Sequence, residues 1–529
     1  MRPLGVEIAA MLADRGTDTV FGIPGVHNIE LYRGIEQAGI RHVLARHEQG
    51  AGFMADGYAR ATGKPGVCFV ISGPGLTNIM TPMGQAYSDS VPMLVISTVL
   101  DETAAKRGQL HQMRDQEGAA HAVCDWSETA QSPEAAYALI NRAFAEFETS
   151  RPRPKHVQIP IAVLGAAAPP APQPRIKPIG GKLAPKPSDL TQVAALLKSA
   201  LKPLIIFGGG AKRVPHKQVT DVLSRTGAAS FVTYAGRGIV ATDTPRFMGA
   251  HLASGGAEAF IGQADLILAI GTELASTDRW RATLGAKAPI IRVDIDHEML
   301  GQSTGEDIAI RADADLFLRG LNTELGQTEL DTHWDDAELG EIRQKWTQDV
   351  ANARPGIVPI CDALRAALPE KLRIYSDMTQ FAYAAKEIWD MDIPGLWHHP
   401  VGFGTLGYAL PAAIGGAATG GPTLAIAGDY GLQYTLQELG TAAELGLSLP
   451  ILIWDNEALG EIRDNMVEAQ IAPNAVHALN PDWQHLAAAY RCAFAAPKTV
   501  KDLCDVTLEA FEAGRPTLIV ATPEISSSS

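Results

Sequence analysis

The stretch PTLAIAGDYG, residues 422–431, and the stretch PILIWDNEALG, residues 450–460, decide the fold class. Each is a short apolar run that ends in polar residues, and one helix fits between the two. A strand, a helix and a second strand in this order form a β-α-β unit with two parallel strands. The carboxyl ends of both strands then meet at one edge of the sheet, where open α/β sheets bind their ligands.

Similar runs recur along the chain and predict three tandem α/β domains, each with a doubly wound parallel sheet. The expected boundaries are an N-terminal domain at 1–165, a linker rich in Pro and Ala at 166–188, a central domain at 189–330, a polar linker at 331–354 and a C-terminal domain at 355–529. The runs that predict strands are TDTVFGIPG, IRHVLARHE, PGVCFVISGPG and VPMLVIST in the first domain, PLIIFGGGAKR, GAASFVTYAG, ADLILAIGTEL and APIIRVDID in the second, and LRIYSDM, PTLAIAGDY, PILIWDNE and RPTLIVAT in the third.

The composition is that of an ordinary globular protein, with 529 residues, 46% hydrophobic residues and a net charge of −15. The negative charge argues against a nucleic-acid or anionic membrane partner. No apolar run reaches the roughly 18 residues that a membrane-spanning helix needs, and the N-terminus is unlike a signal peptide. The five cysteines are scattered singly, which indicates buried free thiols in a reducing compartment. We therefore expect a cytoplasmic enzyme without a nucleic-acid or membrane partner.

Asp429 and Asn456 follow the two strands of the β-α-β unit. Their side-chain oxygens, with a nearby backbone carbonyl, suit an octahedral Mg²⁺ whose other ligands are phosphate oxygens and water. Gly428 and Gly431 flank the aspartate, and the helix that follows can direct its first N–H groups at a phosphate. A Gly-Asp pair after a strand is also common in plain turns. The residues alone leave both interpretations open.

Glu48 stands in the run RHEQGAGFMADGYARATGKPG, residues 46–66, which otherwise has the small and apolar residues of a packed helix. A buried carboxylate is costly unless it shares a proton or pairs its charge. One interpretation is a helix-start carboxylate that the helix dipole stabilises. The other is an acid with a function, and the pattern does not decide between them.

Two further patterns are less informative. FGGGAKR, residues 207–213, lacks the spacing of a dinucleotide fingerprint and is interpreted as a tight turn. His398 and His399 have no third ligand nearby for a zinc site, so they either line a pocket or lie on the surface. No serine or cysteine stands in a G-x-S-x-G motif, so the sequence does not indicate a hydrolase nucleophile.

With these motifs in place, the chain resembles the thiamine diphosphate-dependent enzymes of the acetolactate synthase and benzaldehyde lyase group over nearly its full length. The motifs that carry the resemblance are FGIPG at 21–25, RHEQGAG at 46–52, SGPGLTN at 72–78, GFGTLGYALPAAIG at 402–415, GDYG at 428–431 and WDNEALG at 454–460. The resemblance implies pyrimidine-binding, central and diphosphate-binding domains in that order, with thiamine diphosphate and Mg²⁺ as cofactors.

The resemblance also gives Glu48 a role. In the family, the glutamate at this position hydrogen-bonds N1′ of the aminopyrimidine ring and favours the imino tautomer, whose nitrogen removes the C2 proton of the thiazolium. Gly25, His27 and Gln112 are then expected to face the reacting carbon from the neighbouring subunit, with His27 and Gln112 as catalytic residues beside Glu48. For His27, a histidine that merely satisfies its own hydrogen bonds is the alternative.

The cofactor and metal residues carry over by motif. Leu406 falls where the family has a bulky aliphatic residue that supports the V-shaped cofactor, and simple core packing is compatible with that role. Asp429, Asn456 and the carbonyl of Ala458 match the metal ligands. The expected cofactor-binding residues are Gly25, Gln380, Gly404, Leu406, Gly428, Asp429, Tyr430, Gly431 and Asn456.

Several residues depart from the pattern of acetolactate synthases. Tyr430 replaces the second glycine of the usual GDG, Asn465 stands where those enzymes keep a tryptophan, and Glu461 stands where they have mostly apolar residues. In the central domain, GTELASTDRW replaces an arginine-rich RFDDR pattern. These differences argue against a housekeeping acetolactate synthase and make FAD an unlikely cofactor. A more polar pocket would suit a polar or charged substrate.

The resemblance implies a decarboxylase or carboligase that acts on a 2-oxo acid, in a homodimer or homotetramer with shared active sites. Alternatives within the fold are a lyase that cleaves a 2-hydroxy ketone and a flavin-linked oxidase of 2-oxo acids. A non-catalytic scaffold that only binds cofactor is the alternative from another class. Retention of Glu48, Asp429 and Asn456 together argues against a scaffold, because an inactive copy has no need of a buried carboxylate.

Overall fold

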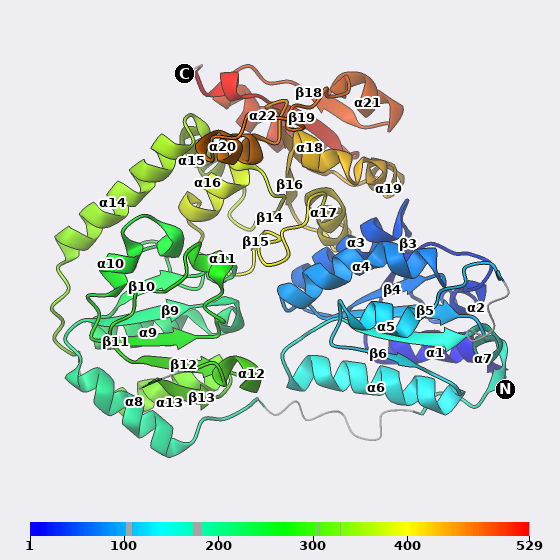
Figure 1. Cartoon of the computed structure of the whole chain (residues 1–529), viewed down its shortest axis with the longest axis horizontal. Helices are drawn as coiled ribbons and strands as arrows, with labels where there is room; N and C mark the ends of the chain where they lie inside the picture. Colours follow the sequence, from blue (N-terminus) through cyan, green and yellow to red (C-terminus); the bar gives the residue numbers. More distant parts are fainter. Residues whose placement is uncertain (102–107, 173–181, 304, 306, 328, 528–529) are drawn as a thin grey trace. The chain divides into compact units, whose positions relative to one another are not determined.

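The computed structural model of the chain describes residues 1–101, 108–172, 182–303, 305, 307–327 and 329–527. They fall into two compact units (Figure 1). The first unit consists of Met1–Gly180, Leu372–Thr379 and His399–Ile525, and the second of Gly181–Lys371, Gln380–His398 and Ser526–Ser529. The first unit contains an N-terminal and a C-terminal sheet, and the second contains a central sheet. The strands of these three sheets are parallel, which confirms the predicted fold class.

The N-terminal sheet has the strand order β3-β2-β4-β5-β7-β6. Its central strand β5 is buried along its whole length, as its mostly apolar sequence MLVISTV predicts. The elements of this part are β1 (Arg2–Pro3), α1 (Leu4–Asp14), β2 (Thr19–Gly22), α2 (Ile29–Tyr32), β3 (Arg41–Leu44), α3 (Glu48–Thr62), β4 (Gly66–Val70), α4 (Pro74–Ser88), β5 (Met93–Val99), α5 (Gln116–His121), β6 (Trp126–Thr129), α6 (Pro133–Thr149), β7 (Lys155–Pro160), α7 (Ile161–Gly165) and β8 (Ala167–Ala168).

The C-terminal sheet has the order β14-β16-β17-β19-β18 for its strands in the first unit. Strands β16 and β17 are parallel neighbours, with Gly428 opposite Trp454, as the β-α-β spacing predicts. The elements of this part are β14 (Arg373–Ser376), α17 (Ala409–Ala417), β16 (Thr423–Gly428), α18 (Asp429–Gln433), η4 (Leu436–Glu438), α19 (Leu439–Glu444), β17 (Pro450–Trp454), α20 (Gly460–Glu468), α21 (Trp483–Ala489), β18 (Ala493–Ala495), α22 (Val500–Ala510), β19 (Thr517–Ala521) and η5 (Pro523–Ser527).

The second unit is built on a sheet with the order β10-β9-β11-β12-β13. Its elements are α8 (Pro187–Ser199), β9 (Pro203–Phe207), η1 (Gly209–Ala211), α9 (His216–Thr226), β10 (Ala229–Val232), η2 (Tyr234–Gly236), η3 (His251–Ala253), α10 (Ala257–Ile261), β11 (Leu266–Ile270), α11 (Ser276–Arg279), β12 (Ile290–Asp294), α12 (His297–Leu300), β13 (Ile308–Arg311), α13 (Ala314–Leu325), α14 (Asp336–Ala353), α15 (Ile357–Ala367), α16 (Gln380–Ile388) and β15 (Trp397–His398).

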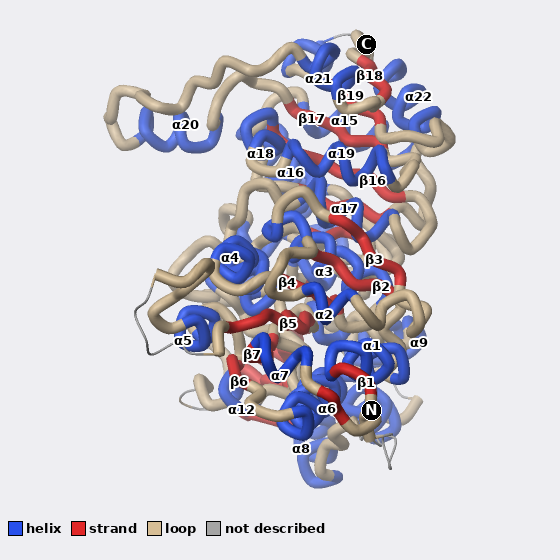
Figure 2. Tube along the Cα trace, turned by 90° about the vertical axis from the view of Figure 1, so that its right-hand side faces the viewer, coloured by secondary structure: helices blue, strands red, loops and turns tan. Residues whose placement is uncertain are grey.

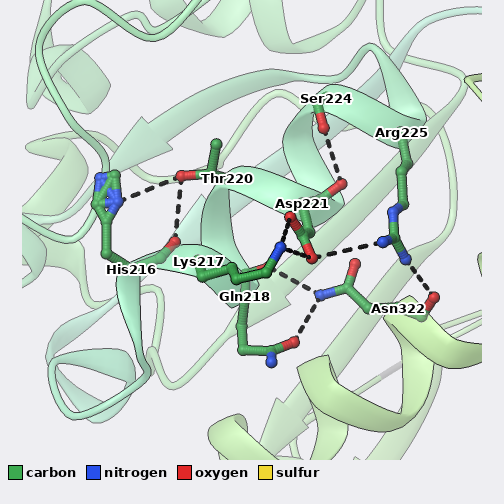
Figure 3. A network of polar contacts seen from close by, with 8 residues as sticks. All are labelled: His216, Lys217, Gln218, Thr220, Asp221, Ser224, Arg225 and Asn322. Atoms are coloured by element: carbon green, nitrogen blue, oxygen red, sulfur yellow. Dashed lines mark hydrogen bonds and ion pairs between the residues drawn. The ribbon is translucent and has the colours of Figure 1, made fainter. Parts of the chain in front are cut away.

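A polar network joins α9 to α13 in this unit (Figure 3). Asp221 accepts from Lys217 and from Arg225, one turn before and after it. The Asn322 amide on α13 donates to the carbonyl oxygen of Gln218 at 2.9 Å and to its side chain at 3.0 Å. These hydrogen bonds and ion pairs fix the packing of the two helices, and the side-chain oxygen of Asn322 is buried without a hydrogen-bond partner among the described residues.

Most of the segment expected to be a polar linker at 331–354 forms the helix α14. Its few apolar residues lie on one side of the helix, and Leu339 and Trp346 are buried in the core of the second unit beside Phe231 and Phe260. The acidic residues that make the sequence look like a linker occupy the solvent-facing side. The other expected linker, at 166–188, lies in part outside the described residues.

All five cysteines are buried and free of disulfides, as expected from their spacing. No helix in the described part of the chain is long and apolar enough to cross a membrane.

The pattern of apolar runs does not predict strands β6 and β7, because both sequences contain several polar residues. Lys155 is buried on β7 and pairs with Asp125 at 2.9 Å and Glu146 at 3.1 Å. His156 lies between two serine hydroxyls, 2.7 Å from Ser97 Oγ and 2.7 Å from Ser127 Oγ. Burial lowers the pKa of His156 to about 3. The pairing of β7 with β5 and β6 therefore depends on a histidine that stays neutral.

His156 makes the first unit sensitive to acid. In an unfolded chain its pKa is about 6.5, so the folded state resists a proton that the unfolded state accepts. Its contribution to stability is complete above pH 6.5 and is lost as the pH falls toward 3, by up to about 1.4 kcal/mol per pH unit. We expect His156→Gln to reduce the loss of unfolding free energy between pH 7.5 and 4.5, measured by urea denaturation.

The exposed His121, at the end of α5, offers the control. His121→Gln should follow the wild-type pH dependence. Equal slopes for wild type and His156→Gln would show that His156 does not set the acid sensitivity.

Candidate active site

The two loops at the carboxyl ends of β16 and β17 bring carboxylate and amide oxygens to one edge of the C-terminal sheet. Asp429 follows β16 as the first residue of α18 and is 2% exposed. Asp455 and Asn456 follow the neighbouring strand β17. The burial of Asp429 raises its pKa, and the nearby charge of Asp455 adds to that effect. Two carboxylates this close favour a bound cation between or beside them.

Asn480 joins these two carboxylates. Its amide donates to Asp429 Oδ2 at 2.7 Å and to Asp455 Oδ1 at 2.8 Å. Its own oxygen accepts from Gln433 Nε2 at 3.1 Å. Trp483 Nε1 holds the second oxygen of Asp455 at 2.7 Å. Both polar atoms of the Asn480 side chain form hydrogen bonds, so the residue fixes the orientation of the expected metal ligand Asp429.

The residues at this edge fit a Mg²⁺ ion by their donor chemistry. Asp429 and Asn456 offer side-chain oxygens, and Ala458 is buried in a loop whose backbone pairs with that of His477. Magnesium prefers such oxygen donors and leaves positions for phosphate and water. No group of three or more His, Cys, Asp or Glu in the described residues forms a ligand cluster, which is consistent with an oxygen set that mixes side chains with a carbonyl.

Tyr430, the departure from the usual GDG, packs its ring edge-on against Tyr434 at 5.8 Å between centroids. The tyrosine is thus held by its own helix. Gly431 has little space, because a Cβ there would lie 3.0 Å from Asp377 Oδ2. At Gly428 a Cβ would lie 3.1 Å from Thr379 Oγ1. Both glycines therefore lie in tight contact with side chains of the residues that follow β14.

Asp377, directly after β14, fixes the loop that carries Gly404 and Leu406. Its carboxylate accepts from the N–H of Met378 at 2.8 Å and of Gly407 at 2.8 Å. Burial raises the pKa of Asp377 to about 7, against the opposing effect of its backbone donors. Gly404 and Gly407 have φ of 68° and 81°, which only glycine adopts without strain. Leu406 lies half-buried between them.

Glu48 is the first residue of α3 and is 8% exposed. Asn78 Nδ2 donates to its Oε2 at 2.9 Å. A Cβ at Gly75 would lie 3.4 Å from its Oε1, so α4 passes close to the carboxylate. Glu48 therefore combines a place at the start of a helix with a hydrogen bond from a side chain of α4.

Glu438 in turn fixes the chain just before α3. Its carboxylate accepts from the backbone N–H of Arg46 at 3.0 Å and of His47 at 3.0 Å. A Cβ at Gly50 would lie 2.3 Å from Glu438 Oε1. The carboxylate sits against the start of α3, where the helix dipole favours negative charge.

His27 lies beside the start of α4. Its Nδ1 is 2.8 Å from Ser72 Oγ, and its ring meets the ring of His111 edge-on at 4.9 Å. Burial, and secondarily the neighbouring His111, lower the pKa of His27. The N–H of Gly25 donates to Asn28 Oδ1 at 2.7 Å and so fixes the turn before His27. A neutral imidazole held in this way is suited to accept or deliver a proton.

The two expected glutamines lie in different units. Gln112 is on the loop before α5, and its Oε1 accepts from the N–H of Gln109 at 3.3 Å. Gln380 is the first residue of α16, where the chain enters the second unit.

The structure thus gathers the predicted residues of the first unit into two clusters. The N-terminal cluster, around residues 72–78, contains Gly25, His27 and Glu48. The C-terminal cluster contains Gly404, Leu406, Gly428, Asp429, Tyr430, Gly431, Asn456 and Ala458. The residues that sequence reasoning missed are Ser72, Asn78, His111, Asp377, Glu438, Asp455 and Asn480. Ser72 and Asn78 lie at the two ends of the motif SGPGLTN, so this motif could have indicated both residues.

The less informative patterns have structural explanations. His399 is buried, with its Nδ1 2.9 Å from Ser376 Oγ. His398 is also buried, so neither histidine is a surface residue. In FGGGAKR the chain passes from β9 into η1, and a Cβ at Gly208 would lie 2.3 Å from the carbonyl oxygen of Gly271. That segment is the tight turn that its sequence indicates.

Known protein families match all three parts of the chain. The N-terminal TPP binding domain of thiamine pyrophosphate enzymes matches residues 4–119, the central domain matches 190–321, and the C-terminal TPP binding domain matches 377–521. The chain belongs to the thiamine pyrophosphate enzyme family. The resemblance drawn from the motifs is thereby confirmed, and with it an enzyme that depends on thiamine diphosphate.

Curated relatives of this family member extend over most of its length. The probable 2-ketoarginine decarboxylase AruI of Pseudomonas aeruginosa is 43% identical over 504 residues, which cover 94% of this chain and 90% of the relative. The large subunit of acetolactate synthase isozyme 1 of Escherichia coli is 29% identical over 467 residues, with 86% and 81% covered. The large subunit of isozyme 2 of Escherichia coli is 30% identical over 501 residues, with 90% and 88% covered.

We expect Asn480→Ala to weaken the Mg²⁺-dependent binding of thiamine diphosphate by about tenfold or more, because residues that orient a metal ligand contribute on this scale. Without the amide, Asp429 and Asp455 face each other unbridged. The measurement is a fluorescence titration of the protein with thiamine diphosphate at several Mg²⁺ concentrations. Asn474→Ala, an exposed change on the same segment, is the control. Identical affinities for both variants would refute the role of Asn480.

Proposed function

We propose that this enzyme is a Mg²⁺- and thiamine diphosphate-dependent decarboxylase of 2-oxo acids, and that 2-ketoarginine is its substrate. One observation carries the proposal, the 43% identity to a probable 2-ketoarginine decarboxylase across 94% of this chain. The identity to the two acetolactate synthase subunits is 29% and 30%. The general part of the proposal, decarboxylation of a 2-oxo acid, agrees with both groups of relatives. The specific part, 2-ketoarginine with its guanidinium group as the substrate, rests on the first relative alone.

The residues of α20 support a cationic substrate. This helix begins two residues after Ala458, and Glu461 and Asn465 lie on it where acetolactate synthases have apolar residues and a tryptophan. A carboxylate is the natural partner of a guanidinium, which it binds through charge-assisted hydrogen bonds. Figure 2 shows α20 at the end of a long loop that extends away from the strands of its domain. The helix is therefore free of the sheet packing that would demand an apolar sequence.

Each cluster of the first unit has a task in this proposal. Thiamine diphosphate, when bound, supplies the nucleophilic carbon and the electron sink. Asp429, Asn456 and the Ala458 carbonyl would hold Mg²⁺, and Asn480 orients Asp429. Glu48 would hold the pyrimidine ring of the cofactor by a hydrogen bond and share a proton with it. A buried carboxyl suits this exchange because a dry site strengthens its hydrogen bonds.

His27 has the task of moving a proton after CO₂ has left. A decarboxylase completes its reaction by adding a proton to the substrate carbon and releasing an aldehyde. A carboligase instead joins that carbon to a second carbonyl compound, and the acetolactate synthase relatives make this the second candidate function.

The proposal includes a homodimer or homotetramer in which two copies of the chain complete each site. Apolar side chains beside the N-terminal cluster support it, because Val26 is 68% exposed next to His27 and Leu110 is 61% exposed next to His111. On and after α20, Val467 is 59% and Ile471 is 53% exposed. Exposed apolar residues that flank functional groups indicate a surface that another chain covers.

The first test is CO₂ release by the purified enzyme with Mg²⁺ and thiamine diphosphate, for 2-ketoarginine, pyruvate, 2-oxobutyrate and benzoylformate. We expect the highest kcat/KM for 2-ketoarginine, an aldehyde as product, and a loss of at least about a hundredfold in Glu48→Gln. The exposed Glu36→Gln is the matched control and should retain activity. CO₂ release from pyruvate with a hydroxyketone product would favour the carboligase, and equal activity of Glu48→Gln would refute the assigned role of Glu48.

A further inference from the structure

His111 carries unusual features that the reaction as described does not use. It has φ of 62°, a left-handed conformation that costs energy for a residue with a side chain. It lies on the loop before α5, and its ring meets that of His27 edge-on at 4.9 Å. Backbone strain of this kind persists where the surroundings hold a residue in place, and it is common at functional sites.

The loop of His111 is held against the start of α4. A Cβ at Gly73 would lie 2.6 Å from the carbonyl oxygen of His111, so only glycine allows this approach. The N–H of Gly73 donates to Gln116 Oε1 at 2.9 Å, which ties α5 to the same turn. Ser72, directly before Gly73, is the partner of His27. The structure thus places both histidines against one turn.

The ring of His111 has one nitrogen enclosed by protein. Nδ1 is buried and has no hydrogen-bond partner among the described residues. A buried N–H without an acceptor is costly, so in the neutral ring the proton belongs on Nε2. The residue as a whole is only half-buried, which leaves Nε2 as the nitrogen available to a ligand. His111 therefore offers an N–H donor at Nε2 beside His27.

We propose that His111 is a substrate-binding residue whose Nε2–H donates a hydrogen bond to the carboxylate of the 2-oxo acid. This inference rests on the proposed function and adds to it a residue that recognises the group common to all such substrates. An N–H donor is a suitable partner for a carboxylate, whose oxygens can only accept hydrogen bonds.

The test compares backbone and side chain at position 111. His111→Gly removes the ring and relieves the strain, so it should fold at least as well as the wild type. We expect the KM for every 2-oxo acid that the wild type decarboxylates to rise about tenfold to a hundredfold, the range for losing a hydrogen bond to a charged group. The expected kcat changes much less, and the affinity for thiamine diphosphate stays the same. His111→Asn, which tolerates the left-handed conformation and keeps an N–H donor, should recover part of the loss.

Arg491→Gly is the matched control. Arg491 is exposed, has φ of 60° and lies in a turn after α21, so this variant makes the same backbone change far along the sequence. It should keep the wild-type KM. A wild-type KM in His111→Gly would overturn the proposal and leave the residue with a purely structural role.

A second measurement separates this inference from the proposed function. Binding of 2-ketoarginine and pyruvate is measured by calorimetry on Glu48→Gln and on Glu48→Gln combined with His111→Gly, both loaded with Mg²⁺ and thiamine diphosphate. Weaker binding only in the double variant supports His111 even where the wild type releases no CO₂, an outcome that would refute the decarboxylase. Equal binding overturns the role of His111. A protein that neither binds nor decarboxylates any of the acids overturns both.

Discussion

The close packing of α3 on α17 is the contact on which the rest of the first unit depends. A Cβ at Gly57 would lie 1.9 Å from the carbonyl oxygen of Ala412, and one at Gly415 would lie 1.9 Å from that of Met54. Two backbones can approach this closely only where both positions are glycine. Glu48 begins α3, and the loop of Leu406 leads into α17. One helix contact therefore fixes the position of Glu48 in one cluster and of the loop of Leu406 in the other.

Buried polar groups reinforce this contact. Asp56 is fully buried on α3 and accepts from Tyr408 at 2.6 Å and from Arg60 at 2.6 Å, while Tyr375 donates to the carbonyl oxygen of Gly57 at 2.8 Å. Since each charge is paired and hydrogen-bonded, the polar core adds specificity to the apolar packing around it. Glu438, Asp377 and Asn480 extend the same principle to the loops, where each orients a segment that holds an expected functional residue. These hydrogen bonds and ion pairs offset the free-energy cost of burying the polar groups.

The fold and the central site residues could be predicted because their signals are local. Apolar runs that end in Asp429 or Asn456 report both a strand and the chemistry at its end, and β16 and β17 pair as that pattern predicts. Strands β6 and β7 could not be found in this way, because Lys155 and His156 are buried only through partners distant in sequence. Asn480 and His111 were missed for a related reason, since one acts through Asp429 and the other is marked by backbone strain. The order of residue types along the chain does not predict such contacts between distant side chains or such backbone conformations.

In the proposed oligomer, one chain carries two half-sites and a second copy completes each of them. Mixing two inactive variants, Glu48→Gln and Asp429→Asn, after subunit exchange tests this most directly. In a mixed dimer, one site then combines an intact Glu48 with an intact Asp429 from the other chain. We expect recovery of about a quarter of wild-type CO₂ release, because half of the dimers are mixed and half of their sites are intact. No recovery from a mixture shown to contain mixed dimers would mean that each site is built within a single chain.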